Sequence, residues 1–207
     1  ACRKINPEFC FSYEGGWDRL MSYTDLSWWG ATDDLLKQVF PQRALATGIE
    51  QPFDYNKVNI AVLNGCHLLV GPANYNRGME YPPMKPLCRY IAEVTRIRHK
   101  LFGALSRGAI IDASEGLLKR KQSLLKIRGA FARSPHAKWK IFRDTETGLR
   151  AVVLANLGNT PLKAGGIAFA DSPRAPCEVH QPFQKMTPSR FPLVLTIPPE
   201  RVAIVTA

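Results

Sequence analysis

The feature that most constrains the fold is a regular alternation, over the first hundred residues, of short apolar segments with segments of helical spacing. Three short segments predict strands, at residues 8–13, 43–47 and 67–70. Each is followed by a loop and then by a segment whose apolar residues recur at helical spacing, at residues 33–40, 55–64 and 84–105. This order, repeated three times, is typical of parallel βα units.

The last of these helical segments is the longest. Leu87, Ile91, Val94, Leu101 and Leu105 form one apolar stripe along residues 84–105, which is the pattern of an amphipathic helix. We therefore predict a single long helix here, with this stripe buried against the strands.

The pattern changes after Gly108. Segments rich in strand-forming residues then recur between turn signals, at residues 124–132, 138–143, 151–155, 177–181, 193–197 and 202–206. Short strands at such spacing predict an antiparallel β-sandwich. We expect a linker over residues 109–121, with a short helix at 115–121, and a sandwich over residues 122–207.

Three βα units cannot close a barrel, which needs eight. We therefore predict an α/β fold in which residues 1–108 form the last three or so units of a (β/α) barrel, followed by the all-β antiparallel sandwich. The chain opens on ACRKINPEFC, without an initiator methionine, which fits either processing or a piece of a longer protein. We expect the earlier barrel units to be absent from this sequence or to come from elsewhere.

The net charge is +11, and it is placed unevenly. Residues 1–80 contain 7 Lys/Arg and 9 Asp/Glu, whereas residues 81–207 contain 21 and 8. A basic half can attract nucleic acid or another polyanion, or it can be an ordinary solvated surface. The basic residues are not interleaved with aromatic residues, so we predict no specific nucleic-acid partner.

Several other chemistries lack their sequence signals. The five cysteines include no CxxC, although a Cys2–Cys10 disulfide stays open, and the four histidines are far apart, so we predict no metal site. There is no GxSxG, Walker or GxGxxG motif, and we expect no cofactor. No apolar run is long enough to span a bilayer and no leader is visible, so we expect no membrane partner. Cellular location and oligomeric state stay undetermined.

Loops that follow the predicted strands carry the residues suited to chemistry. In (β/α) barrels the active site lies at the carboxyl ends of the strands. Aromatic rings there can stack on sugar rings, while carboxylates and amides can bind hydroxyl groups. The candidates are Glu14, Trp17, Asp18, Arg43, Glu50, Asp54, Tyr55, Asn74 and Arg77. Of these, Arg77 is equally suited to an ion pair with Glu80.

Glu14 and Asp18 are the catalytic candidates, because glycoside hydrolysis needs two carboxyl groups across the scissile bond. Glu14 directly follows an apolar segment, and the two glycines after it permit close approach of a substrate. The alternative is that Glu14 pairs with Arg19 or Arg43 and that Asp18 only caps a turn. The catalytic hypothesis places Glu14 at the mouth of one cleft with Trp17, Asp54 and Arg77.

Four segments carry a family resemblance: YEGGWDRLMSYTDLSWWG, DYNKVNIAVLNGCHLLVGP, KIRGAF and RAVVLANLGNTPL. Together they resemble the C-terminal portion of glycoside-hydrolase-like barrel proteins of the α-galactosidase type. The resemblance implies a nucleophile on an earlier barrel strand and an acid/base carboxylate after a later one. Glu14 matches the later carboxylate by position, although those enzymes generally have aspartate there.

These expectations combine into one functional hypothesis. We expect a glycoside hydrolase, or a fragment of one, that acts on O-glycosidic bonds of a carbohydrate substrate with one catalytic carboxylate supplied from outside this chain. The alternative is a non-catalytic module that binds carbohydrate or a polyanion through the basic C-terminal half.

Overall fold

A computed structural model of the 207-residue chain describes residues 4, 12–14, 26–28, 44–71 and 79–207, and only the backbone of 12–14, 27 and 28. The predicted helix at 33–40 and the Cys2–Cys10 pair lie outside these residues.

The N-terminal part contains a parallel sheet. Its strands are β1 (Ser12–Glu14), β2 (Leu26–Trp28), β3 (Ala44–Ile49) and β4 (His67–Val70). They pair in the order β1-β2-β3-β4, and every pairing is parallel. The sequence predicted β3 and β4, and the strand predicted at residues 8–13 overlaps β1 at Ser12 and Tyr13, its residues 8–11 lying outside the described part of the chain. The fourth, β2, has only three residues and lies where we expected a loop.

Helix α4 (Tyr55–Leu63) connects β3 to β4. Val58, Ala61 and Val62 are fully buried, as their helical spacing predicted. Gly65 then adopts a left-handed φ of 67°, and its N–H donates to the carbonyl of Val62 at 3.1 Å. Glycine suits this position because it has no Cβ to oppose a positive φ, so the chain can reverse into β4.

The helix predicted over residues 84–105 is divided. A 3₁₀ turn (η1, Pro82–Met84) leads into α5 (Lys85–Lys100), and a wider π-helical turn (η2, Gly103–Arg107) follows. A Cβ at Gly103 would lie 2.2 Å from Oδ2 of Asp144. The glycine therefore lets the antiparallel part of the molecule approach closely at the point where the regular helix ends.

The apolar stripe of α5 is buried as predicted, with Leu87 and Val94 fully inaccessible. We expect Leu87→Ala to lower the free energy of unfolding by about 2–5 kcal/mol, because it removes buried methyl groups and leaves a cavity. Urea titration followed by circular dichroism measures this. The matched control is Leu117→Ala, because Leu117 is 77% exposed. Equal stability of the two variants would contradict the assigned face.

The C-terminal part consists of two antiparallel sheets. Their strands are β5 (Ala109–Ala113), β6 (Leu125–Gly129), β7 (Ala137–Arg143), β8 (Arg150–Asn156), β9 (Leu162–Phe169), β10 (Pro176–His180), β11 (Thr187–Arg190), β12 (Leu193–Ile197) and β13 (Arg201–Thr206). The larger sheet has the order β11-β10-β13-β8-β7-β5, and the smaller sheet has the order β12-β9-β6. One hydrophobic core joins the two sheets.

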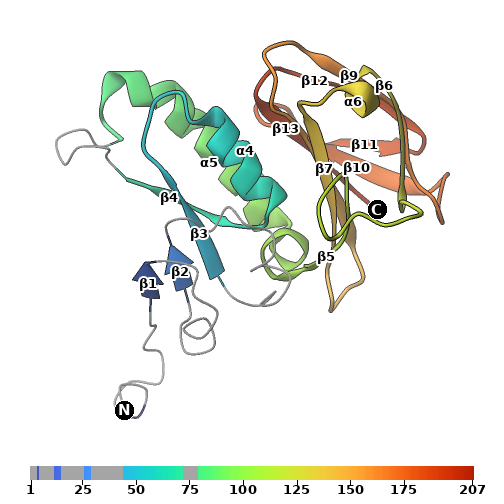
Figure 1. Cartoon of the computed structure of the whole chain (residues 1–207), viewed down its shortest axis with the longest axis horizontal. Coiled ribbons are helices and arrows are strands. Elements are labelled where there is room, and N and C mark those ends of the chain that lie inside the picture. The colour runs from blue at the N-terminus through green and yellow to red at the C-terminus, as the bar shows by residue number, and fades with distance from the viewer. Residues whose placement is uncertain (1–3, 5–11, 15–25, 29–43, 72–78) are drawn as a thin grey trace.

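The six-stranded sheet is covered on both faces. Along β8, Val152 and Leu154 belong to the core shared with the small sheet, while Ala151, Val153 and Ala155 belong to a second core with α4 and α5. Side chains alternate between the faces of a strand, so this strand is apolar throughout. The helices therefore lie between the parallel strands and the six-stranded sheet (Figure 1).

Three local predictions in this region were wrong. Residues 109–113, expected in the linker, form β5 at the edge of the six-stranded sheet. Residues 115–121 form no helix, because the backbone there turns around the buried carboxylate of Asp112. The strand expected over 124–132 ends at Gly129, whose φ is 86°, and the short helix α6 (Ala130–Arg133) follows.

His180 makes stability depend on pH. Its side chain is 3% exposed, and burial, together with the charge of Lys100, lowers its pKa, although Glu178 partly opposes this. In the unfolded chain this histidine takes up a proton as the pH falls below about 6.5. In the folded protein it takes up the proton only at a lower pH. We expect the stability present above about pH 6.5 to be lost as pH falls through the folded-state pKa.

The measurement is urea unfolding across this range for the parent and for His180→Gln. The glutamine variant cannot titrate, so its free energy of unfolding should fall less steeply over the same interval. Parallel pH profiles for the two proteins would contradict the assignment.

Candidate functional site at the ends of the parallel strands

The candidate site lies where the parallel strands end. Glu14 is the last residue of β1, Glu50 follows β3, and Gly71 follows β4. The N–H of Gly71 donates to the carbonyl of Ile49 at 3.1 Å, so the ends of β3 and β4 stay together. Because all four strands are parallel, their carboxyl ends lie at the same edge of the sheet.

The strand register places Glu14 relative to the other strands. Position 14 pairs with Trp28, Trp28 with Ala46, and Ala46 with His67. Position 14 is thus level with Ala46, three residues before the end of β3. β1 therefore ends three residues short of the end of β3, and β2 lies between the two strands.

This register separates the backbones of Glu14 and Glu50. Glu50 lies four residues farther along, or about 13 Å at about 3.3 Å per residue, and two strands away, or about 10 Å. The resulting backbone separation is about 16 Å, so the two glutamate side chains would have to extend toward each other for their carboxyl groups to reach the roughly 5–9.5 Å found in glycosidases.

The carboxylate of Asp54 is occupied by its own loop. Its Oδ2 accepts hydrogen bonds from the N–H groups of Glu50 at 3.0 Å and Gln51 at 2.9 Å. The same atom lies 3.2 Å from Nζ of Lys57, and the residue is 6% exposed. Asp54 thus closes the turn between β3 and α4 and holds Glu50 in place, whereas Glu50 itself is half-buried.

Tyr55 faces the antiparallel part of the molecule. Its ring centroid lies 5.6 Å from that of Tyr90, and the guanidinium of Arg201 lies 4.5 Å from each ring. Burial raises the pKa of Tyr90, whose hydroxyl oxygen accepts a hydrogen bond from the N–H of Val202 at 3.3 Å. These contacts place Tyr55 where α4 and α5 meet β13.

The side chains of the other predicted site residues are not described. For Glu14 the structure describes the backbone alone. Five others lie outside the described residues, namely Trp17, Asp18, Arg43, Asn74 and Arg77.

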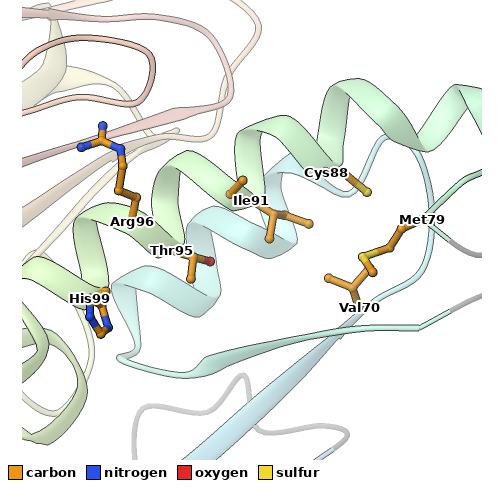
Figure 2. A pocket seen from close by; sticks show the side chains of 8 residues that line it. Val70, Met79, Cys88, Ile91, Thr95, Arg96 and His99 are labelled. Carbon is orange, nitrogen blue, oxygen red and sulfur yellow. The ribbon is translucent and has the colours of Figure 1, made fainter.

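An apolar groove of about 530 Å³ runs between β4 and the outer side of α5. Val70 and Met79 line one side, and Cys88, Ile91 and Thr95 follow one another along the helix on the other (Figure 2). A neighbouring hollow of about 230 Å³ shares Ile91 and Thr95 with it. Among the described strands β4 is at one edge of the sheet, so this groove flanks an edge at which the sheet could continue.

Arg98 is a buried cation that the sequence analysis missed. Its guanidinium donates to the carbonyl of Cys66 and, at 3.3 Å, to the hydroxyl of Ser106, and burial lowers its pKa to about 10. It ties α5 to the turn that begins β4. A charged residue beside Ile97, within an otherwise apolar stripe, was the sequence signal that could have indicated this buried cation.

Within residues 44–71 and 79–207, no group of three His, Cys, Asp or Glu side chains is placed to hold a metal ion. No helix in the described part of the chain is long and apolar enough to cross a membrane.

No known protein family and no curated protein matches the sequence. Several solved structures are similar to this chain. A noncanonic maltogenic α-amylase from Thermotoga neapolitana has a TM-score of 0.55 at 8% identity, over 99% of this chain and 56% of that one. A debranching enzyme from Nostoc punctiforme, from a crystal soaked with acarbose, has a TM-score of 0.52 at 14% identity, over 99% and 52%. A GH30 endoxylanase from Clostridium papyrosolvens reaches only 0.48 at 10% identity, over 90% and 50%, which is too low to weigh here.

The chain thus shares, distantly, the fold of glycoside hydrolases, as the sequence resemblance predicted. It spans about half the length of the structures it matches. At these identities the likeness shows the fold alone.

Proposed function

We propose that this chain is part of a glycoside hydrolase that cleaves O-glycosidic bonds of a carbohydrate substrate. The observation that carries the proposal is the set of parallel strands with carboxylate residues at or just after their ends, Glu14 on β1 and Glu50 after β3. The fold similarity to an amylase and a debranching enzyme supports the same class of reaction.

Within this proposal, Glu14 is the general acid/base and Asp18 is the second carboxylate available in this chain. A nucleophile supplied from outside these 207 residues completes the pair. Trp17, Arg43, Glu50, Asn74 and Arg77 are the proposed substrate contacts. Asp54 and Tyr55 shape the loop and the packing of α4, because their polar groups and rings already have partners.

The architecture we propose is a section of a (β/α) barrel that ends at residue 108, followed by a β-sandwich that begins with β5. Further βα units would continue the sheet beyond β4 and cover the apolar side of α5. Two facts support this proposal: the groove beside β4 is apolar, and the matched structures are about twice as long as this chain.

The test is hydrolysis by the native polypeptide that carries this sequence. Aryl glycosides of the common hexoses and pentoses, together with α-glucan oligosaccharides, form the panel, and product release is followed by absorbance and by reducing ends. We expect turnover of at least one substrate. A folded protein that releases nothing from the whole panel would refute the proposal.

A binding role without hydrolysis is the second candidate. It is favoured by Lys119, Arg120 and Arg143 in the antiparallel part of the molecule, which form no ion pair with any residue that the structure describes.

A further inference from the structure

The excess positive charge of this protein is concentrated in one stretch of sequence. Residues 116–143 contain nine Lys/Arg and no Asp/Glu. The structure places this stretch on the loop after β5, on β6, on α6 and on β7. These elements surround one hollow, which Lys119, Arg120 and Lys138 line, whereas Lys140 is buried and donates to Oδ1 of Asn64 at 2.7 Å.

This polar hollow, of about 280 Å³, opens between the two sheets. Trp139 of β7, half-buried, lines it together with Lys119, Arg120 and Lys138. The hydroxyl-bearing residues Ser114, Ser123 and Ser134 complete its polar lining.

A second hollow of about 330 Å³ shares Arg120 with the first and is also lined by Arg143, Arg150 and Asp171. Arg120 therefore joins two neighbouring depressions, each flanked by cations. Together the two hollows present a basic surface formed by Lys119, Arg120, Lys138, Arg143 and Arg150.

The charges of this surface are largely uncompensated. Of the two carboxylates that line it, Glu115 pairs with Lys138 and Asp171 pairs with Arg150 at 2.7 Å. Lys119, Arg120 and Arg143 form no ion pair with any residue that the structure describes. Three cations are thus available to an incoming anion.

The loop that carries Lys119 and Arg120 is held in place from beneath. The carboxylate of Asp112, fully buried, accepts hydrogen bonds from the N–H of Arg120 at 3.3 Å, the N–H of Leu124 at 2.6 Å and the hydroxyl of Ser123 at 3.0 Å. A loop fixed in this way loses little further freedom when it binds a ligand.

We propose that these two hollows form a binding site for an acidic oligosaccharide, one whose sugar residues carry carboxylate groups. Guanidinium groups match carboxylates in shape and charge, the indole of Trp139 offers an apolar surface to a sugar ring, and serine hydroxyls can bind sugar hydroxyls. Single-stranded nucleic acid is less suited, because it is held by successive aromatic platforms and Trp139 and Phe131 are the only described aromatic residues that line either hollow. The site deepens the second candidate function and does not depend on hydrolysis.

Isothermal titration calorimetry with a tetrasaccharide of galacturonic acid tests the proposal. We expect saturable binding that weakens as salt is added. Arg120→Gln removes the cation shared by both hollows and should weaken binding about tenfold, the size expected for one charge-assisted hydrogen bond. Lys119→Gln should weaken it in the same direction. The matched control is Arg89→Gln on α5, an exposed arginine that lines neither hollow, which should leave binding unchanged.

Two further ligands decide the chemical class. A neutral tetrasaccharide of galactose should bind much more weakly than the acidic one. An oligouridylate of equal charge should also bind more weakly, and equal or tighter binding of this RNA would overturn the proposal. So would an Arg120→Gln variant no different from Arg89→Gln. Because calorimetry detects binding directly, a protein without hydrolytic activity can still pass this test.

Discussion

Replacement of Glu14 by glutamine is expected to lower the rate of glycoside hydrolysis by about 10²–10⁴-fold, the usual contribution of general acid–base catalysis. Glutamine keeps the shape and most of the hydrogen bonding of glutamate but has no titratable proton. It therefore cannot protonate the leaving group. Glu14 is the residue to change because it is the last residue of β1, at the carboxyl end of a parallel strand.

The measurement is kcat/KM over a range of pH, in the native polypeptide, on any substrate that the parent protein cleaves. If Glu14 is the acid, the variant should also lose the limb of the pH profile that reports this group. Glu146→Gln is the matched control, because Glu146 is exposed and lies in the antiparallel part of the molecule. A Glu14 variant with the turnover of this control would leave Glu14 a structural residue.

The second large effect is expected at Asp112. Besides the three bonds from Arg120, Ser123 and Leu124, its carboxylate accepts one from the N–H of Ala113 at 2.9 Å. Hydrogen bonds to a charged group contribute about 1.5–3 kcal/mol each, although coupled bonds do not add simply. We expect Asp112→Ala to lower the free energy of unfolding by about 3–5 kcal/mol.

Urea titration of three variants separates the contributions. Asp112→Asn keeps one acceptor oxygen and should lose less stability than the alanine variant. Asp171→Ala removes an exposed carboxylate that pairs with Arg150, and surface pairs of this kind contribute less than about 1 kcal/mol. An Asp112→Ala variant as stable as Asp171→Ala would show that water replaces the lost acceptor.

The segments predicted correctly have strong periodicity and clear ends. Helix α4 combines apolar spacing with a terminal glycine, and β7, β8 and β13 are uninterrupted runs of strand-forming residues. In these segments, local propensity and final burial favour the same conformation. Of the two catalytic candidates, Glu14 lies at the end of β1, close to the end of the strand predicted from the sequence.

The strands that were missed have no such local signal. β9 contains two glycines, and β11 has the sequence TPSR, which is typical of a turn. Both are strands because neighbouring strands supply their hydrogen bonds: β9 lies between β12 and β6, and β11 pairs with β10. Pairing between distant segments therefore determined their conformation.

The same distinction applies to the sites. The pattern of side chains close in the chain was enough to predict that strands and helices alternate from β3 to α5 and that strands dominate after residue 108. Only the tertiary structure decided that Asp54 closes a turn, that Tyr55 packs on Tyr90, and that Arg120 joins two basic hollows. The contacts of Tyr55 and Arg120 depend on long-range packing, which brings together groups that no local sequence pattern connects. The bonds of Asp54 are local, to residues three and four positions away, but they depend on a turn conformation that the spacing of apolar residues does not reveal.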